Sequence, residues 1–189
     1  DTLAPIFDSY RKPKKGLLEY LNEVKIGENF HTEQDLLERK QKLHDNPYFQ
    51  WLYDTHGDQY HQKLAEYLDK RNFNCTSLFS YSRNYDLYQS MLAFLEKNGH
   101  EKSAKRTKVL IEKIKTGNNY WDSSFTFYKQ DGNFHALIAR TLDAFHPTED
   151  RLISTREAMH LMGLPSDFRL VSNELNHICQ NVPVCTAQD

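Results

Sequence analysis

The 189-residue sequence has few cysteines and no long apolar run. Its three cysteines, Cys75, Cys179 and Cys185, form no Cys-x-x-Cys pair, which argues against a disulfide scaffold and favours a reducing compartment. No apolar segment approaches the roughly 20 residues of a membrane-spanning helix, and the first residues lack the charged-then-apolar pattern of a signal peptide. We therefore predict a soluble intracellular protein without a membrane partner.

The sequence also lacks a strong charge of either sign. Its formal net charge is −2, which by itself indicates neither a nucleic acid nor a membrane as the partner. Aromatic residues make up 13% of the chain and charged residues 26%, whereas disordered chains are poor in aromatic residues. We predict a folded chain with a large polar surface.

Helical spacing of apolar residues dominates the first two thirds of the chain. Thr32 and Asp35 are arranged as a capping box, and Pro47 suits the first turn of a helix. Asn98-Gly99 is a typical helix end, and Ser103 is the predicted N-cap of a lysine-rich helix. The predicted helices span residues 17–24, 33–44, 48–56, 60–68, 87–97 and 104–116.

The pattern changes near residue 120. Residues 121–128 alternate aromatic and small polar side chains, Asp131-Gly132-Asn133 is a turn signal, and residues 134–142 are apolar and partly alternating. These features predict a hairpin or two short strands. Residues 72–82 fit a connector or another short strand better than a helix.

A complete capping box, Ser154-Thr155-Arg156-Glu157, begins a later helix. Leu164-Pro165 ends that helix after about two turns, and a further short helix is predicted from about residue 172 to Ile178. Together these elements predict a mainly α-helical fold with a small β element, of the α+β class. We divide the chain into a helical region at residues 1–120 and a C-terminal segment at residues 121–189.

Several residues of the C-terminal segment stand at a tight spacing. An Arg-Glu-Ala sequence opens the helix, a glycine follows its apolar positions, and a proline is followed three positions later by an aromatic residue. These residues are Arg156, Glu157, Gly163, Pro165 and Phe168. In residue type and spacing, residues 146–168 resemble the late motif of DNA cytosine-5 methyltransferases. The resemblance implies a target-recognition-like helical region before this motif, and implies that the C-terminal segment is a piece of a Rossmann-type α/β methyltransferase fold.

A second stretch, residues 177–183, resembles the final motif of the same family around its Val-Pro. The family pattern is Gln-x-Gly-Asn-Ala/Ser-Val-Pro, whereas here Cys179 stands at the glycine position. That glycine suits a close backbone approach or a positive φ, which Cys179 resists. In the family this stretch helps to line the S-adenosylmethionine pocket. The resemblance assigns cofactor contacts to Gln180, Asn181 and Val182.

The chemistry of this family needs groups that the sequence does not show. Methyl transfer to cytosine C5 requires a nucleophile that adds to C6. Family members use a cysteine from a Pro-Cys loop, a glutamate and a Gly-rich cofactor loop, and none is recognisable here. We predict packing roles for the three cysteines, no catalytic residue in this chain, and a missing N-terminal catalytic domain as its partner. S-adenosylmethionine is the expected cofactor of the complete enzyme, with no tight binding to this segment alone.

A basic stretch lies where the family carries its target-recognition region. Residues 97–115 contain seven basic and two acidic residues, a balance of +5, whereas residues 116–189 total −4. Lysine and arginine side chains neutralise DNA phosphates, so we predict double-stranded DNA as a partner. The alternative is a lysine-rich helix face that is only solvated. The predicted DNA contacts are Lys102, Lys105, Arg106 and Lys108.

Three hypotheses follow for the function. The first is the DNA-recognition and C-terminal segment of a cytosine-5 methyltransferase, in a bacterial or phage-derived cytoplasmic enzyme or a eukaryotic nuclear one. The second is a non-enzymatic DNA-binding or regulatory subunit that keeps a methyltransferase-like tail, and the third is a helical interaction domain. A metal site is not predicted, because His56 and His61 have no further ligand at suitable spacing.

Overall fold

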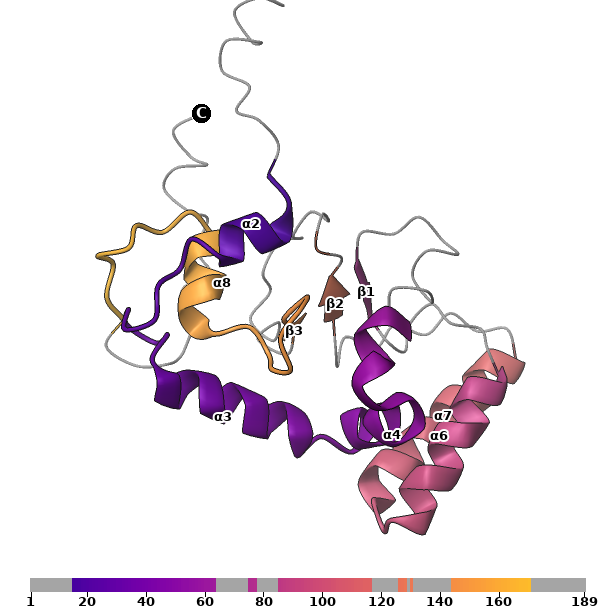
Figure 1. The fold of residues 1–189 in the computed structure, drawn as a ribbon. Helices are drawn as coiled ribbons and strands as arrows, with labels where there is room; N and C mark the ends of the chain where they lie inside the picture. The colour runs from indigo at the N-terminus through magenta and orange to yellow at the C-terminus, as the bar shows by residue number, and fades with distance from the viewer. Residues whose placement is uncertain are drawn as a thin grey trace, which may run out of the picture.

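The computed structural model describes residues 15–63, 75–77, 85–116, 126–128, 130 and 144–170. Helices predominate in this part of the chain, and a small sheet accompanies them (Figure 1), which confirms the α-rich prediction. The helices are α2 (Leu17–Leu21), α3 (Glu33–His44), α4 (Pro47–His56), the 3-10 helix η1 (Gly57–Gln59), α6 (Tyr85–Lys97), α7 (Glu101–Lys115) and α8 (Thr155–Leu161). The strands are β1 (Cys75–Ser77), β2 (Thr126–Tyr128) and β3 (Ala144–Phe145). The Rossmann-type assignment stays a prediction.

Local capping signals explain where α3 and α4 begin. The Thr32 hydroxyl accepts the Asp35 backbone N–H at 3.2 Å, and the Asp35 carboxylate accepts the Thr32 N–H at 2.9 Å, so the predicted capping box is confirmed. The Asn46 side chain accepts the Tyr48 N–H at 2.9 Å, with Pro47 in the first turn of α4. The two helices therefore follow one another after a single break.

Two predicted helix boundaries are wrong. Helix α2 ends at Leu21, three residues before the predicted end. Ser103 does not cap α7 but lies inside it, where its carbonyl oxygen accepts the Thr107 hydroxyl at 2.9 Å. Gly99, with a φ of 73°, reverses the chain so tightly after α6 that α7 begins at Glu101.

The sheet has the order β1-β2-β3, with an antiparallel pair followed by a parallel pair. Strand β1 confirms the short strand predicted within residues 72–82, and β2 confirms one within residues 121–128. The predicted second strand at 134–142 lies outside the described residues, as does the predicted helix that ends at Ile178. The helix predicted at residues 60–68 is helical at residues 60–63, and its remaining residues lie outside the described ones.

Two clusters of buried apolar residues hold these elements together. The larger joins α4, α6 and α7, and it includes Phe145 of β3 and Leu152. The smaller joins Leu17 and Leu21 of α2 to β3 and α8. Both clusters combine residues from the predicted 1–120 and 121–189 regions, and the division between those regions stays a prediction. None of the described helices is long and apolar enough to cross a membrane.

Candidate nucleic-acid interface and the buried motif

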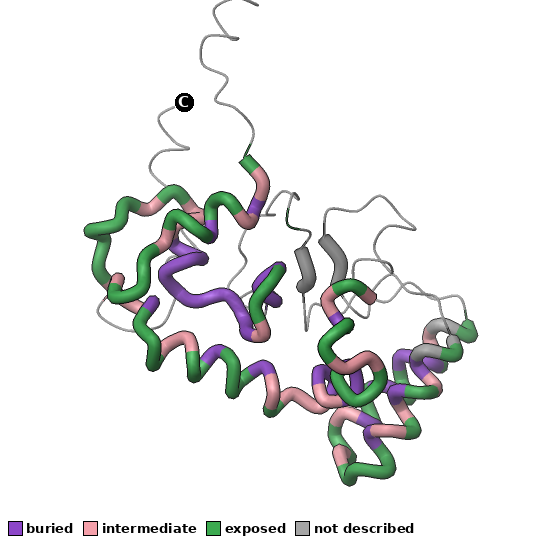
Figure 2. Tube along the Cα trace, in the orientation of Figure 1, coloured by how far each residue is buried: buried purple, intermediate pink, exposed green. Residues whose placement is uncertain are grey.

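The predicted capping box of α8 is buried. The Ser154 hydroxyl accepts the Glu157 backbone N–H at 3.1 Å, and the Glu157 carboxylate accepts the Ser154 N–H at 2.6 Å. The exposed fraction is 1% or less for all four residues from Ser154 to Glu157, and Figure 2 shows the continuous buried stretch that leads into α8. Buried polar groups require partners, so the surroundings of these side chains carry information.

Glu157 is held by Arg151 in a two-pronged ion pair. Arg151 donates from Nη1 and Nη2 to the two carboxylate oxygens, each at 2.7 Å. Burial alone would raise the pKa of Glu157, but the hydrogen bonds and charge of Arg151 hold it below its ordinary value. Arg151 also donates from Nε to the half-exposed carboxylate of Glu149 at 2.7 Å. Glu157 is therefore ionised inside the protein, and the positive charge of Arg151 balances its negative charge.

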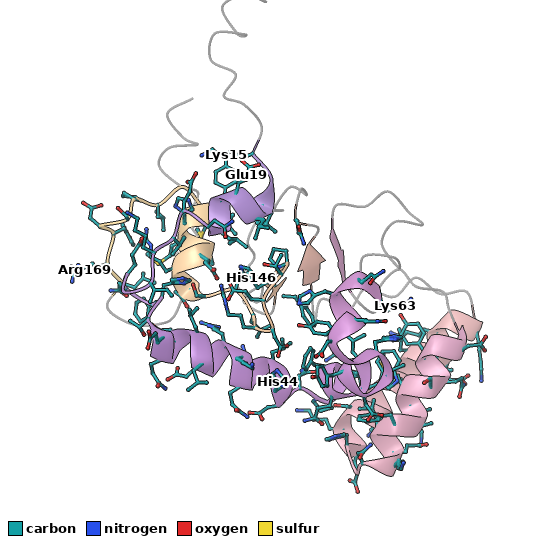
Figure 3. The ribbon with its side chains drawn as sticks, in the orientation of Figure 1. Lys15, Glu19, His44, Lys63, His146 and Arg169 are labelled. Carbon is teal, nitrogen blue, oxygen red and sulfur yellow. The ribbon has the colours of Figure 1, made fainter. Side chains whose placement is uncertain are left out.

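His146 is buried beside this ion pair, between α8 and the sheet (Figure 3). Its Nδ1 accepts the backbone N–H of Glu149 at 3.0 Å and that of Thr148 at 3.3 Å, so Nε2 carries the proton of the neutral ring. Burial, followed by the charge of Arg151, lowers the pKa of His146 to about 4. His146 acts as a neutral acceptor that fixes the turn before Arg151.

Arg156 organises the rest of the motif. Its guanidinium donates to the carbonyl oxygens of Pro165 at 2.7 Å, Phe168 at 3.1 Å and Leu164 at 3.4 Å. Its Nε lies 3.1 Å from a carboxylate oxygen of Glu28, in an ion pair not aligned as a hydrogen bond. The structure thus brings Arg156, Pro165 and Phe168 into one unit, with Phe168 38% exposed at its edge.

Gly163 supplies the reversal that makes this unit possible. Its φ is 78°, in the left-handed region, where a side chain costs about 1–2 kcal/mol. We expect Gly163→Ala to lower the free energy of unfolding by about that amount in urea titration. Asparagine tolerates this conformation better, so Gly163→Asn serves as the matched control and should lose less. Equal losses in the two variants would argue against a conformational role.

The four predicted DNA-contacting residues are all exposed on α7, whereas Ala104, Leu110 and Ile111 of the same helix are buried. Lys108 differs from the others, because it forms an ion pair with Glu96 of α6 at 2.6 Å. In the described part of the chain, Lys102 and Lys105 form no ion pair. Val109, half exposed, stands among the cationic side chains. The result is a positively charged helix face, whose DNA contacts stay a prediction.

Some residues of the buried motif gave no sequence signal. His31 Nδ1 lies 2.7 Å from the Ser154 hydroxyl, and Arg39 donates to the Thr155 hydroxyl at 2.7 Å. These pairs are separated by 123 and 116 residues, so no local spacing could have revealed them. The predicted cofactor residues Gln180, Asn181 and Val182 lie outside the described residues, as do Cys179 and Cys185. No group of three or more potential metal ligands is found in the described ranges.

Comparison with known proteins identifies the family. The family model for C-5 cytosine-specific DNA methylases matches residues 11–184, which includes the helical elements as well as the buried motif. No curated protein and no solved structure matches the chain. Because the family model covers most of the sequence, the chain belongs to the C-5 cytosine-specific DNA methylase family.

Proposed function

We propose that this chain is the target-recognition and C-terminal structural segment of a DNA cytosine-5 methyltransferase. The observation that carries the proposal is the cationic face of α7 in a chain of a DNA methylase family. Base recognition in such enzymes works beside a cytosine that is flipped out of the duplex. The buried motif supports this segment structurally, because Arg156 binds the carbonyl oxygen of Pro165 and pairs with the distant Glu28.

The methyl-transfer chemistry itself is assigned to residues outside this segment. Addition to cytosine C6 needs an activated thiol, and no cysteine in these 189 residues follows a proline. S-adenosylmethionine is the methyl donor that the family implies for the complete enzyme. Gln180, Asn181 and Val182 are the residues of this chain that we propose to contribute to its pocket, on the resemblance of the final motif.

The geometry of α7 suits the sugar-phosphate backbone of duplex DNA. Lys102, Lys105, Val109 and Lys113 follow at intervals of three or four residues and share one helix face. The 11 residue-to-residue steps from Lys102 to Lys113 rise about 16 Å, which is about five base-pair steps of 3.4 Å. Lysine carries a flexible point charge instead of a rigid fork, so it suits phosphates better than base edges.

We expect the triple variant Lys102→Ala, Lys105→Ala and Arg106→Ala to weaken DNA binding at least about tenfold at low salt. Each lost phosphate contact should also make the slope of log affinity against log salt less steep by about 0.9. Fluorescence anisotropy with a duplex oligonucleotide, titrated from low to high salt, measures both quantities.

Lys115→Ala is the matched control, because Lys115 lies on α7 but forms an ion pair with Glu112 at 2.9 Å. It should change the affinity and the slope much less than the triple variant. An unchanged affinity in the triple variant would remove α7 from the DNA interface. Full-length protein that transfers no methyl group from S-adenosylmethionine to cytosine, yet still binds DNA, would favour a non-enzymatic subunit.

A further inference from the structure

Helix α3 runs between the two parts of the molecule that the proposed function uses. Its N-terminal end lies on the side of α8, and its C-terminal end leads into α4, beside the α6 and α7 pair (Figure 1). Only two residues, at positions 45 and 46, connect α3 to α4. The position of the cationic face relative to the buried motif therefore depends on how α3 is held.

The middle of α3 is bonded to the capping box of α8. Arg39, which is 9% exposed, donates to the hydroxyl of the fully buried Thr155 at 2.7 Å. Just before α3, His31 meets the Ser154 hydroxyl at 2.7 Å. Two consecutive residues of the box thus bond to two residues from the α3 segment. Hydrogen bonds in such a buried setting are directional and costly to leave unmade.

The other end of α3 is bonded to the loop that precedes the capping box. Asp150 accepts from His44, the last residue of α3, at 2.7 Å and from the Tyr60 hydroxyl at 3.0 Å. His44 also makes an edge contact with the Phe49 ring of α4, with ring centroids 4.9 Å apart. Asp150 therefore ties α3, and the chain that follows α4, to the motif segment.

From α4 onwards the connection is apolar and continuous. Trp51 and Leu52 of α4 belong to the same buried cluster as Tyr88 and Met91 of α6, and Leu110 of α7 completes it. The Trp51 Nε1 also donates to the Ser90 hydroxyl at 3.4 Å. Packed cores deform little, so a displacement of α3 and α4 carries α6 and α7 with it.

We infer that α3 is a strut that fixes the α7 face relative to α8, with Arg39 and Asp150 as its positioning residues. The inference rests on the proposed function only for its consequence, which is the placement of DNA against the catalytic part. Neither residue is assigned a contact with DNA or cofactor. A displacement of about 1 Å at a reacting centre is enough to cost about a hundredfold in rate.

The test measures geometry and activity separately. Spin labels carried by noncanonical amino acids at Glu101 of α7 and at Ser166, both exposed, report the distance between the two parts by pulsed electron paramagnetic resonance. We expect Arg39→Met and Asp150→Asn to broaden this distance distribution while the helical circular dichroism is retained. In the full-length enzyme, the same variants should lower kcat about ten- to a hundredfold, more than they raise KM for DNA.

Three further variants separate positioning from general loss of stability. Lys42→Met removes an exposed charge from the same helix and should leave the distance distribution and kcat unchanged. Thr155→Val removes the same hydrogen bond, keeps the volume of the side chain, and should broaden the distribution as Arg39→Met does. It serves as the test if Arg39→Met fails to fold. Arg39→Lys keeps a donor at this position, so it should broaden the distance distribution and lower kcat less than Arg39→Met does.

An unchanged distance distribution in Arg39→Met, Asp150→Asn and Thr155→Val would overturn the strut, and so would a broad distribution in the unaltered protein. The distance is measured without DNA. If the protein then fails to bind DNA but shows a narrow distribution that these variants broaden, the strut stands and the proposed function fails.

Discussion

Replacing Glu157 by alanine is expected to lower the free energy of unfolding by about 3–5 kcal/mol. The side chain of its partner Arg151 is only 6% exposed, and it would lose both short hydrogen bonds to the carboxylate. The Ser154 backbone N–H would lose its acceptor as well. Removal of one member of a buried pair costs more than the pair contributes, because the buried charge of Arg151 would keep only the half-exposed Glu149 as its partner. Urea titration followed by circular dichroism measures the loss.

Two companion variants identify the cause. Glu149 also bonds Arg151, but its side chain is 55% exposed, so Glu149→Gln should cost no more than about 1 kcal/mol. The double variant Arg151→Met with Glu157→Gln removes the stranded charge and should recover part of the stability. A loss below 1 kcal/mol in Glu157→Ala would contradict the buried ion pair.

The second large effect is a loss of stability as the pH falls from about 6.5 to about 4. The pKa of His146 is about 4 in the folded protein, below its ordinary value of 6.5. Between these values the unfolded chain binds the proton and the folded chain does not, so acid favours unfolding. The contribution of His146 is complete above pH 6.5, and about 3 kcal/mol of it is lost by pH 4. Urea titrations across this range measure the change.

His146→Asn keeps an acceptor for the backbone N–H groups but cannot take up a proton. It should flatten the dependence on pH between 6.5 and 4. A smaller slope should remain, because burial also lowers the pKa of His31 and His61. A pH profile identical to that of the unaltered protein would show that His146 does not titrate as its surroundings imply. Below about 4.5 Glu157 adds to the same trend, because its pKa is lowered in the folded protein and the unfolded chain takes up the proton first.

Features with a local signal could be predicted from the sequence. Both capping boxes, at Thr32 and at Ser154, are confirmed, because four consecutive residues contain all the groups involved. The start of α7 could not be predicted in this way. Ser103 is a good N-cap by type, but the tight reversal at Gly99 fixes the start of the helix three residues before the predicted start at residue 104.

Only those features of the candidate site that depend on residues close in sequence could be predicted. The exposed side of α7 follows from helical spacing, but the ion pair between Lys108 and Glu96 requires α6 and α7 to pack side by side. The partners of the buried motif come from residues more than a hundred positions away. Such contacts depend on tertiary packing, which single-sequence periodicity does not encode.

The three carbonyl oxygens held by Arg156 bear on how this chain can diverge. Every residue type has a backbone carbonyl, proline included, so this grip on the turn at residues 164–168 does not depend on the side chains there. Exposed positions such as Ser166 and Asp167 are therefore open to substitution while the path of the backbone is kept. Arg156 itself has no such latitude, because lysine lacks the planar fork that reaches several acceptors at once.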